Sequence, residues 1–214
     1  MKPGMIRGLK ALLFFICLVP LGKLTLEVFG VAGMGLGANP VEELIHRFGI
    51  WGLNFLLITL SITPLRYLTG WNWLLRFRRM LGLFAFFYIL MHFLAYAGVD
   101  QRFDPAAIFE DVLERPFITI GFTAFLLLIP LAATSTNGMM KRLGRRWQKL
   151  HRLVYLIAIL GAWHFYWQVK LDTLEPLVYI AILAGLLGYR VWRRYFRSAK
   201  KFRDSREVLS RNDA

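Results

Sequence analysis

Long apolar blocks separated by short charged connections are the dominant pattern along this chain. A block of about 18 or more apolar residues with few charges is typical of a membrane-spanning helix. Such blocks lie at about 9–33, 47–66, 80–99, 116–134, 150–170 and 175–193. We therefore expect an all-α, polytopic membrane protein in which residues 1–214 form one domain, a single bundle of six transmembrane helices with a basic tail at 194–214. No small-x-small cleavage pattern follows the first block, so we expect a retained helix there and not a signal peptide.

The charged residues alternate in sign from one connection to the next. Basic residues gather at the N-terminus, in the regions 66–79 and 135–152 and in the tail, whereas acidic residues gather in the other three connections. Basic loops are retained in the cytoplasm, so we expect both termini on the cytoplasmic side. This topology accounts for the net charge of +14 without any nucleic acid, and the basic face should favour anionic membrane lipid.

The cysteine content narrows the cofactors that the chain can hold. Cys17 is the only cysteine of the sequence and lies inside the first apolar block. A single cysteine permits no internal disulfide, no zinc cluster of the Cys-x-x-Cys type and no covalent c-type haem. We expect Cys17 to pack as a small apolar side chain.

Two of the four histidines fall at similar depths in separate predicted helices. At ~1.5 Å per residue, His92 lies about 18 Å along the 80–99 helix and His164 about 21 Å along the 150–170 helix, both in the outer half of the bilayer. Two imidazoles at one depth suit the two axial positions of a non-covalent haem b, and Gly161 leaves room for a flat ring. Hydrogen bonding to a neighbouring helix is the alternative for each histidine. Zinc fits less well, because it usually takes three or four protein ligands.

His151 lies at the opposite end of the same predicted helix from His164. In a continuous helix the two side chains are about 20 Å apart along the axis and ~140° apart around it, so one cofactor cannot bind both. His151 either binds a second, inner haem or lies in the lipid headgroup region among neighbouring arginines. Arg79 occupies the position that corresponds to His151 on the helix of His92, and Met80 is the nearest conceivable partner ligand.

Polar residues also lie at the predicted outer boundary. His46 comes just before the second predicted helix, and we expect an interface or capping residue there and not a metal ligand. Lys23 and Glu27 have the i, i+4 spacing of a helical ion pair, and we expect them to satisfy each other.

Four stretches of the chain resemble a known family. They are GLGANPVEELIHRFGIWGLNFLLITLSITPLRY, RRMLGLFAFFYILMHFLAY, RPFITIGFTAFLLLIPLAATST and KRLGRRWQKLHRLVYLIAILGAWHFYWQVK. In their order and spacing they resemble the MsrQ (YedZ) family over roughly residues 30–195. That family comprises the haem-binding membrane subunits of the bacterial periplasmic methionine sulfoxide reductase system, and it is part of the wider ferric-reductase-like transmembrane group.

The resemblance implies a function that composition alone does not. Members of the family pass electrons from the quinone pool, or from a cytosolic flavin reductase, across the bacterial inner membrane. The acceptor is MsrP, a periplasmic molybdopterin enzyme that reduces methionine sulfoxide in oxidised proteins, so the sulfoxide chemistry resides in the partner and no catalytic residue is expected here.

The resemblance also implies the site residues and cofactors. His92, His151 and His164 match the family's haem-associated histidines, which implies one or two haems b. FMN is implied as well, although the sequence contains no flavin motif. The wider group has two histidines on each of two helices, and here Arg79 stands in place of the fourth, which puts the inner haem in doubt.

Two functions of other classes stay open on the sequence. A small proton-coupled transporter would use the histidines as a proton relay. A non-redox anchor would only hold a periplasmic enzyme at the membrane. Haem content separates both from an electron-transfer subunit.

Overall fold

The computed structural model describes residues 3–33, 35–169 and 173–212, with side chains described as far as Phe196, and within those ranges every regular element is helical. The elements are α1 (Pro3–Val28), the 3-10 helix η1 (Val31–Gly33), α2 (Pro40–Thr69), the 3-10 helix η2 (Asn72–Arg76), α3 (Arg78–Ala95), the π-helical turn η3 (Tyr96–Asp100), α4 (Pro105–Glu114), α5 (Pro116–Ala133), α6 (Asn137–Leu143), α7 (Arg145–Leu150), α8 (Leu153–Gln168) and α9 (Leu174–Asn212). Residue 170 of the fifth predicted helix and the last two residues of the predicted tail lie outside the described residues.

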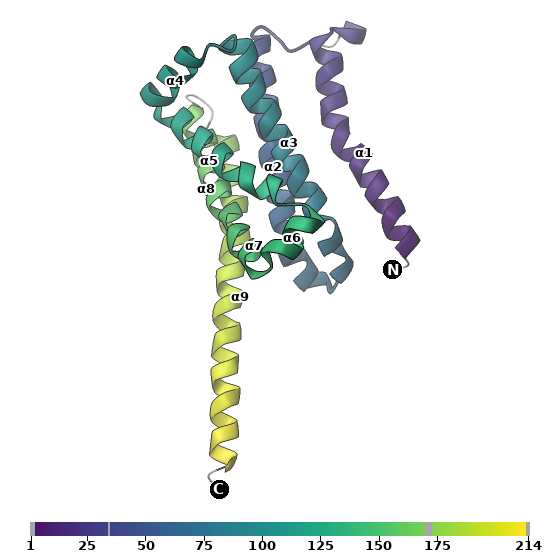
Figure 1. Cartoon of the computed structure of the whole chain (residues 1–214), viewed down its shortest axis with the longest axis vertical. Coiled ribbons are helices and arrows are strands. Elements are labelled where there is room, and N and C mark those ends of the chain that lie inside the picture. The colour runs from purple at the N-terminus through teal and green to yellow at the C-terminus, as the bar shows by residue number, and fades with distance from the viewer. Residues whose placement is uncertain (1–2, 34, 170–172, 213–214) are drawn as a thin grey trace.

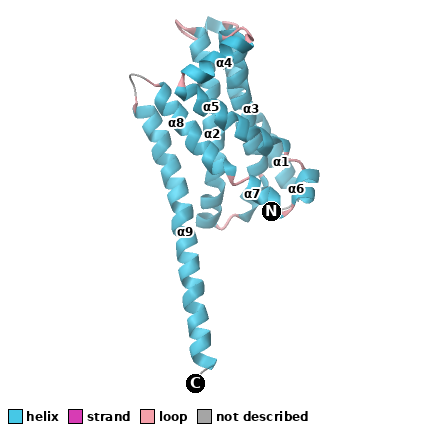
Figure 2. Ribbon diagram, turned by 60° about the vertical axis from the view of Figure 1, so that its left-hand side comes forward, coloured by secondary structure: helices cyan, strands magenta, loops and turns pink. Residues whose placement is uncertain are grey.

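The long helices run side by side in one bundle, as Figures 1 and 2 show. In the described part of the chain, α1, α2, the α3–η3 segment, α5 and α9 are long and apolar enough to cross a membrane. The start of α1 and the end of α9 lie toward the same end of the bundle (Figure 1). This all-α membrane bundle confirms the predicted fold class.

The fifth predicted helix differs from the expectation. It is broken at His151 and Arg152, and its apolar part, α8, has only 16 residues. The break arises because backbone bonds tighten to i→i−3 on both sides of it, from Arg152 N to Lys149 O and from Tyr155 N to Arg152 O. At about 1.5 Å per residue α8 is ~24 Å long, shorter than the ~30 Å hydrocarbon core of a bilayer.

The ends of other helices are set by their local sequence. The Asn39 side chain caps α2, with Pro40 in the first turn, so this helix begins before the predicted residue 47. Gly70 ends α2 in the left-handed conformation, with φ 74°, and its N–H donates to the Arg66 carbonyl. Asp104 accepts from the backbone N–H groups of Ala106 and Ala107 and thereby starts α4, which the sequence did not predict.

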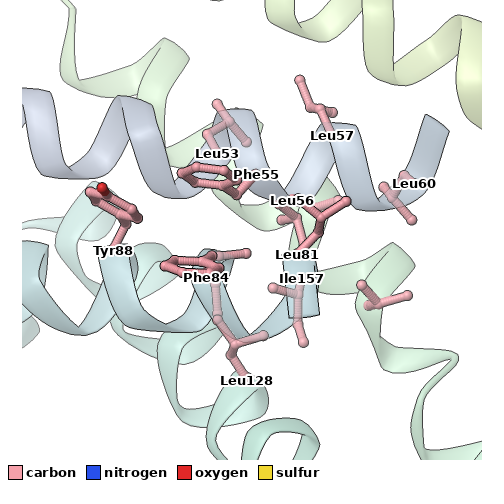
Figure 3. Packing of buried hydrophobic residues seen from close by; sticks show 14 of the residues in the cluster. Leu53, Phe55, Leu56, Leu57, Leu60, Leu81, Phe84, Tyr88, Leu128 and Ile157 are labelled. Carbon is pink, nitrogen blue, oxygen red and sulfur yellow. The ribbon is translucent and has the colours of Figure 1, made fainter. Parts of the chain in front are cut away.

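The core forms chiefly between two helix pairs, α2 with α3 and α5 with α8. Figure 3 shows Phe55, Phe84 and Tyr88 gathered between α2 and α3, with Leu60 and Ile157 among the fully buried side chains. Phe55 stacks on Tyr88 with 5.2 Å between ring centroids. Lipid tails are as apolar as these side chains, so close packing and hydrogen bonds hold such helices together more than burial from water does.

Helix α1 stands at the edge of the bundle (Figure 1) and is attached through the Tyr88 hydroxyl. This hydroxyl accepts from the Leu21 N–H at 3.1 Å and donates to the Cys17 carbonyl at 2.7 Å. Those two backbone groups would bond to each other in a regular helix, so the hydroxyl is inserted into the α1 ladder beside Pro20. Cys17 is buried and free, which agrees with its predicted packing role.

Candidate functional site

The fold brings the rings of His92 of α3 and His164 of α8 close together. Their ring centroids are 6.1 Å apart, and the ring planes make an angle of 79°. A metal–imidazole bond is about 2 Å long, so two imidazoles on opposite sides of one metal have ring centroids about 6 Å apart. The two histidines that the sequence placed at one depth thus have a separation suited to a shared metal atom.

Each of these histidines is held by a hydrogen bond to the backbone of a neighbouring helix. His92 Nδ1 lies 2.8 Å from the Ile45 carbonyl oxygen of α2, and His164 Nδ1 lies 2.7 Å from the Phe117 carbonyl oxygen of α5. A carbonyl can only accept, so Nδ1 carries the proton in both rings and Nε2 keeps its lone pair. This is how proteins orient imidazole ligands of metals.

The two rings line a partly open cavity of about 460 Å³ between α2, α3, α5 and α8. Its walls are mainly apolar or small and include Gly161, as expected, together with Leu53, Ile89, Phe93, Phe125 and Ile157. Polar side chains line it as well: Asn39, Glu42, Asp100, Arg115 and Gln168. In the described part of the chain no three His, Cys, Asp or Glu side chains are grouped to hold a bare metal ion. The donor set therefore fits a metal that brings its own equatorial ligands, as haem does.

His151 lies apart from this cavity and does not line it. Its ring stacks on Trp147 at 3.8 Å between centroids, Nδ1 bonds to the Trp147 carbonyl at 3.1 Å, and Nε2 lies 3.4 Å from Ser135 Oγ. Arg79, at the position of the missing histidine, bonds to Asn137 Oδ1 and so ties α3 to α6. The assignment of His151 as a haem ligand stays a prediction.

The outer boundary carries an ion network larger than the expected pair. Lys23 and Glu27 are paired at 3.8 Å, as predicted, but Lys23 is 68% exposed and Glu27 only 8%. The stronger partner of Glu27 is Arg47, which also bonds to Glu43 at 2.6 Å. Arg47 thus joins the end of α1 to the start of α2.

His46 has a different setting from the predicted one. It lies within α2, whose cap is Asn39, and its ring centroid is 5.7 Å from that of Phe165. It lines the histidine cavity and also a second cavity of about 850 Å³ that lies under the segment Gly35–Asn39. The expectation of a capping residue is therefore wrong, because the helix begins earlier than its apolar run.

Sequence reasoning missed the carbonyl partners of the two histidines. The signal was present as a spacing, because each carbonyl residue comes 47 positions before its histidine. In both helix pairs a glycine, Gly49 or Gly121, follows the carbonyl residue by one helical turn. Every residue has a backbone carbonyl, so the residue type does not show which carbonyl accepts a hydrogen bond. Only this repeated spacing could have indicated the two acceptors.

Comparison with known proteins agrees with the all-α membrane fold. Residues 48–162 match the family described as ferric reductase like transmembrane component. A haem-binding subunit MsrQ of protein-methionine-sulfoxide reductase from Xanthomonas campestris pv. campestris (strain 8004) is 58% identical over 159 residues, 74% of this chain and 73% of the relative. The MsrQ proteins of Xanthomonas oryzae pv. oryzae (strain MAFF 311018) and Herminiimonas arsenicoxydans are each 51% identical over 92% and 93% of this chain and 91% of the relative.

No solved structure matches the chain. Two of these relatives nevertheless cover 92% and 93% of its length. The family match over residues 48–162 contains His92 and ends two residues before His164. This chain belongs to the MsrQ family of ferric-reductase-like transmembrane proteins.

Proposed function

We propose that the protein is the haem b-containing electron-transfer subunit of a methionine sulfoxide reductase system in the bacterial inner membrane. The observation that carries this proposal is the pair His92 and His164, with ring centroids 6.1 Å apart at a mainly apolar cavity. The names of its relatives, haem-binding subunits of protein-methionine-sulfoxide reductase, point to the same role.

In this proposal His92 and His164 would hold the haem iron through their Nε2 atoms. The Nδ1 bonds to Ile45 and Phe117 hold the rings in place before the haem enters, which lowers the ordering cost of binding. Arg115 supplies positive charge for the haem carboxylates. When bound, haem supplies a one-electron carrier whose potential the axial ligands and burial set.

The direction of transfer follows from the predicted topology. The acceptor is the periplasmic molybdopterin enzyme MsrP, which docks at the outer end, near the mouth of the cavity. The donor is the quinone pool or a cytosolic flavin reductase. FMN stays an expectation that rests on family resemblance.

A single haem accounts best for the described residues. Arg79, which stands in place of a second inner histidine, bonds to Asn137, so the described residues offer no second imidazole to pair with His151. The pyridine haemochrome content per polypeptide measures the number directly, and a value near two would show that His151 or another residue binds a second haem.

The first test is the reduced-minus-oxidised absorption spectrum of the purified protein. We expect the α-band of a b-type haem with two imidazole ligands, and its absence would contradict the proposal. His92→Ala and His164→Ala should each abolish this band, because one remaining imidazole cannot fix the haem in the cavity. His151→Ala should keep this band at full strength if the protein holds a single haem, and a partial loss would assign His151 to a second one.

The same variants separate the alternative functions. A non-redox anchor predicts that His92→Ala leaves methionine sulfoxide reduction by the membrane-bound partner intact, whereas an electron-transfer subunit predicts its loss. A proton-coupled transporter predicts no haem in the wild-type protein.

A further inference from the structure

We propose that Gly49 and Gly121 are positioning residues that set the hydrogen bond donated by each histidine ligand and thereby tune the haem potential. The inference rests on the proposed function, because it assigns a role to two residues that touch the ligands. Neither glycine occupies a conformation that only glycine can adopt, and both lie inside regular helices. Their role must therefore come from the space that the absent side chain leaves.

The two glycines face the two imidazoles at very short range. A Cβ on Gly121 would lie 2.7 Å from His164 Nδ1 and 2.8 Å from its Cε1, and a Cβ on Gly49 would lie 3.0 Å from His92 Nδ1. Contacts under about 3 Å do not persist between such atoms, so an alanine would push the ring away. The atom that it meets first is Nδ1, which carries the proton of the hydrogen bond.

The same arrangement occurs twice, once in each helix pair. In α2 the Ile45 carbonyl accepts the hydrogen bond from His92 Nδ1–H, and Gly49 lies one turn further along the helix. In α5 the Phe117 carbonyl and Gly121 have the same relation to His164. A glycine one turn after the accepting carbonyl exposes the backbone and lets the imidazole reach an oxygen that a side chain would otherwise cover.

The hydrogen bond has a direct electronic effect on a metal ligand. An Nδ1–H that donates to a carbonyl makes the imidazole a stronger base at Nε2, which favours the more positive, ferric state of a bound iron. Loss or lengthening of this bond raises the reduction potential. The tighter contact at Gly121 predicts that His164 responds more strongly than His92.

Gly121→Ala and Gly49→Ala, compared with two control glycines, test the inference. A Cβ on Gly52 would lie 2.5 Å from Ile89 Cγ1. Gly52→Ala therefore crowds α2 against α3 at a residue of the same cavity wall without touching an imidazole. A Cβ on Gly82 would meet only Thr59 Cγ2, at an ordinary 3.7 Å. The readouts are haem per polypeptide, the midpoint potential, the electron paramagnetic resonance spectrum of the ferric haem and the melting temperature in detergent.

We expect Gly121→Ala to raise the midpoint potential and shift the ferric g-values, or to lose the haem while helical content is kept. Gly49→Ala should change the same quantities less, Gly52→Ala should lower the melting temperature without a shift in g-values, and Gly82→Ala should change neither. An unchanged spectrum and potential in Gly121→Ala would overturn the inference. So would haem loss in Gly52→Ala equal to that in Gly121→Ala, because general crowding would then be the cause. If the wild-type protein holds no haem, the proposed function itself fails.

Discussion

At the scale of single residues, hydrogen bonds to backbone carbonyls decide what the buried polar side chains do. His92, His164 and Tyr88 each donate to a main-chain oxygen on another helix. The depth of the two histidines could be predicted from their positions in the apolar blocks. Their tautomers could not, because the accepting oxygens come from Ile45 and Phe117, whose apolar side chains give no hint of the bond.

Tyr88→Phe tests the residue that holds α1 to the bundle. Removing the hydroxyl leaves the Leu21 N–H and the Cys17 carbonyl without their partner, at a cost of about 1–3 kcal/mol for buried unpaired groups. We expect a lower melting temperature and faster proteolysis in α1, with the haem spectrum kept. Tyr195→Phe removes a hydroxyl from a side chain that is 72% exposed and should have no effect. Equal stability of the two variants would show that the Leu21 N–H and the Cys17 carbonyl bond to each other once the hydroxyl is gone, with no loss of free energy of unfolding.

At the scale of elements, the apolar blocks predicted which helices exist better than where they begin and end. Asn39 and Asp104 start helices ahead of or outside the apolar runs, because capping and proline chemistry operate independently of hydrophobicity. The break at His151 was missed because the predicted helix was begun at residue 150, whereas the continuous apolar run starts only at Leu153. The ion pair of Lys23 and Glu27 was predicted from its spacing, but Arg47 was not, because it comes from another helix.

Arg47→Ala tests the junction between α1 and α2. The change leaves Glu27, only 8% exposed, with the distant and mobile charge of Lys23 as its partner. Removing one member of a buried pair costs up to several kcal/mol, and because Arg47 is itself 31% exposed we expect about 1–3 kcal/mol, seen as a lower melting temperature. The double variant Glu27→Gln/Arg47→Gln should recover most of this loss. A single variant as stable as the wild type would mean that water already screens the carboxylate.

At the scale of the whole molecule, charge and helix direction point to the same arrangement. The start of α1, the α6–α7 region and the end of α9 carry most of the basic residues and lie toward one end, while α4 and the connection between α1 and α2 lie toward the other (Figure 1). The charge alternation was sufficient to predict this polarity. It did not predict that α8, with 16 residues, would be the shortest of the long helices. The number of times the chain crosses the membrane depends on whether this short helix spans it.

Single cysteines introduced on a Cys17→Ala background test the number of crossings and the orientation together. Gly35 and Gly138 have open space around a Cβ, and Thr173, between α8 and α9, is exposed. If α8 spans the membrane, Gly35→Cys and Thr173→Cys should react with an impermeant maleimide added to intact spheroplasts, and Gly138→Cys should react only after lysis. Basic segments stay in the cytoplasm. Labelling of Gly138→Cys in intact spheroplasts would therefore show that the protein has the opposite orientation to the predicted one. Protection of Thr173→Cys with labelling of Gly35→Cys would show that α8 does not cross the membrane, and the depth predicted for His164 from a full crossing would then be wrong.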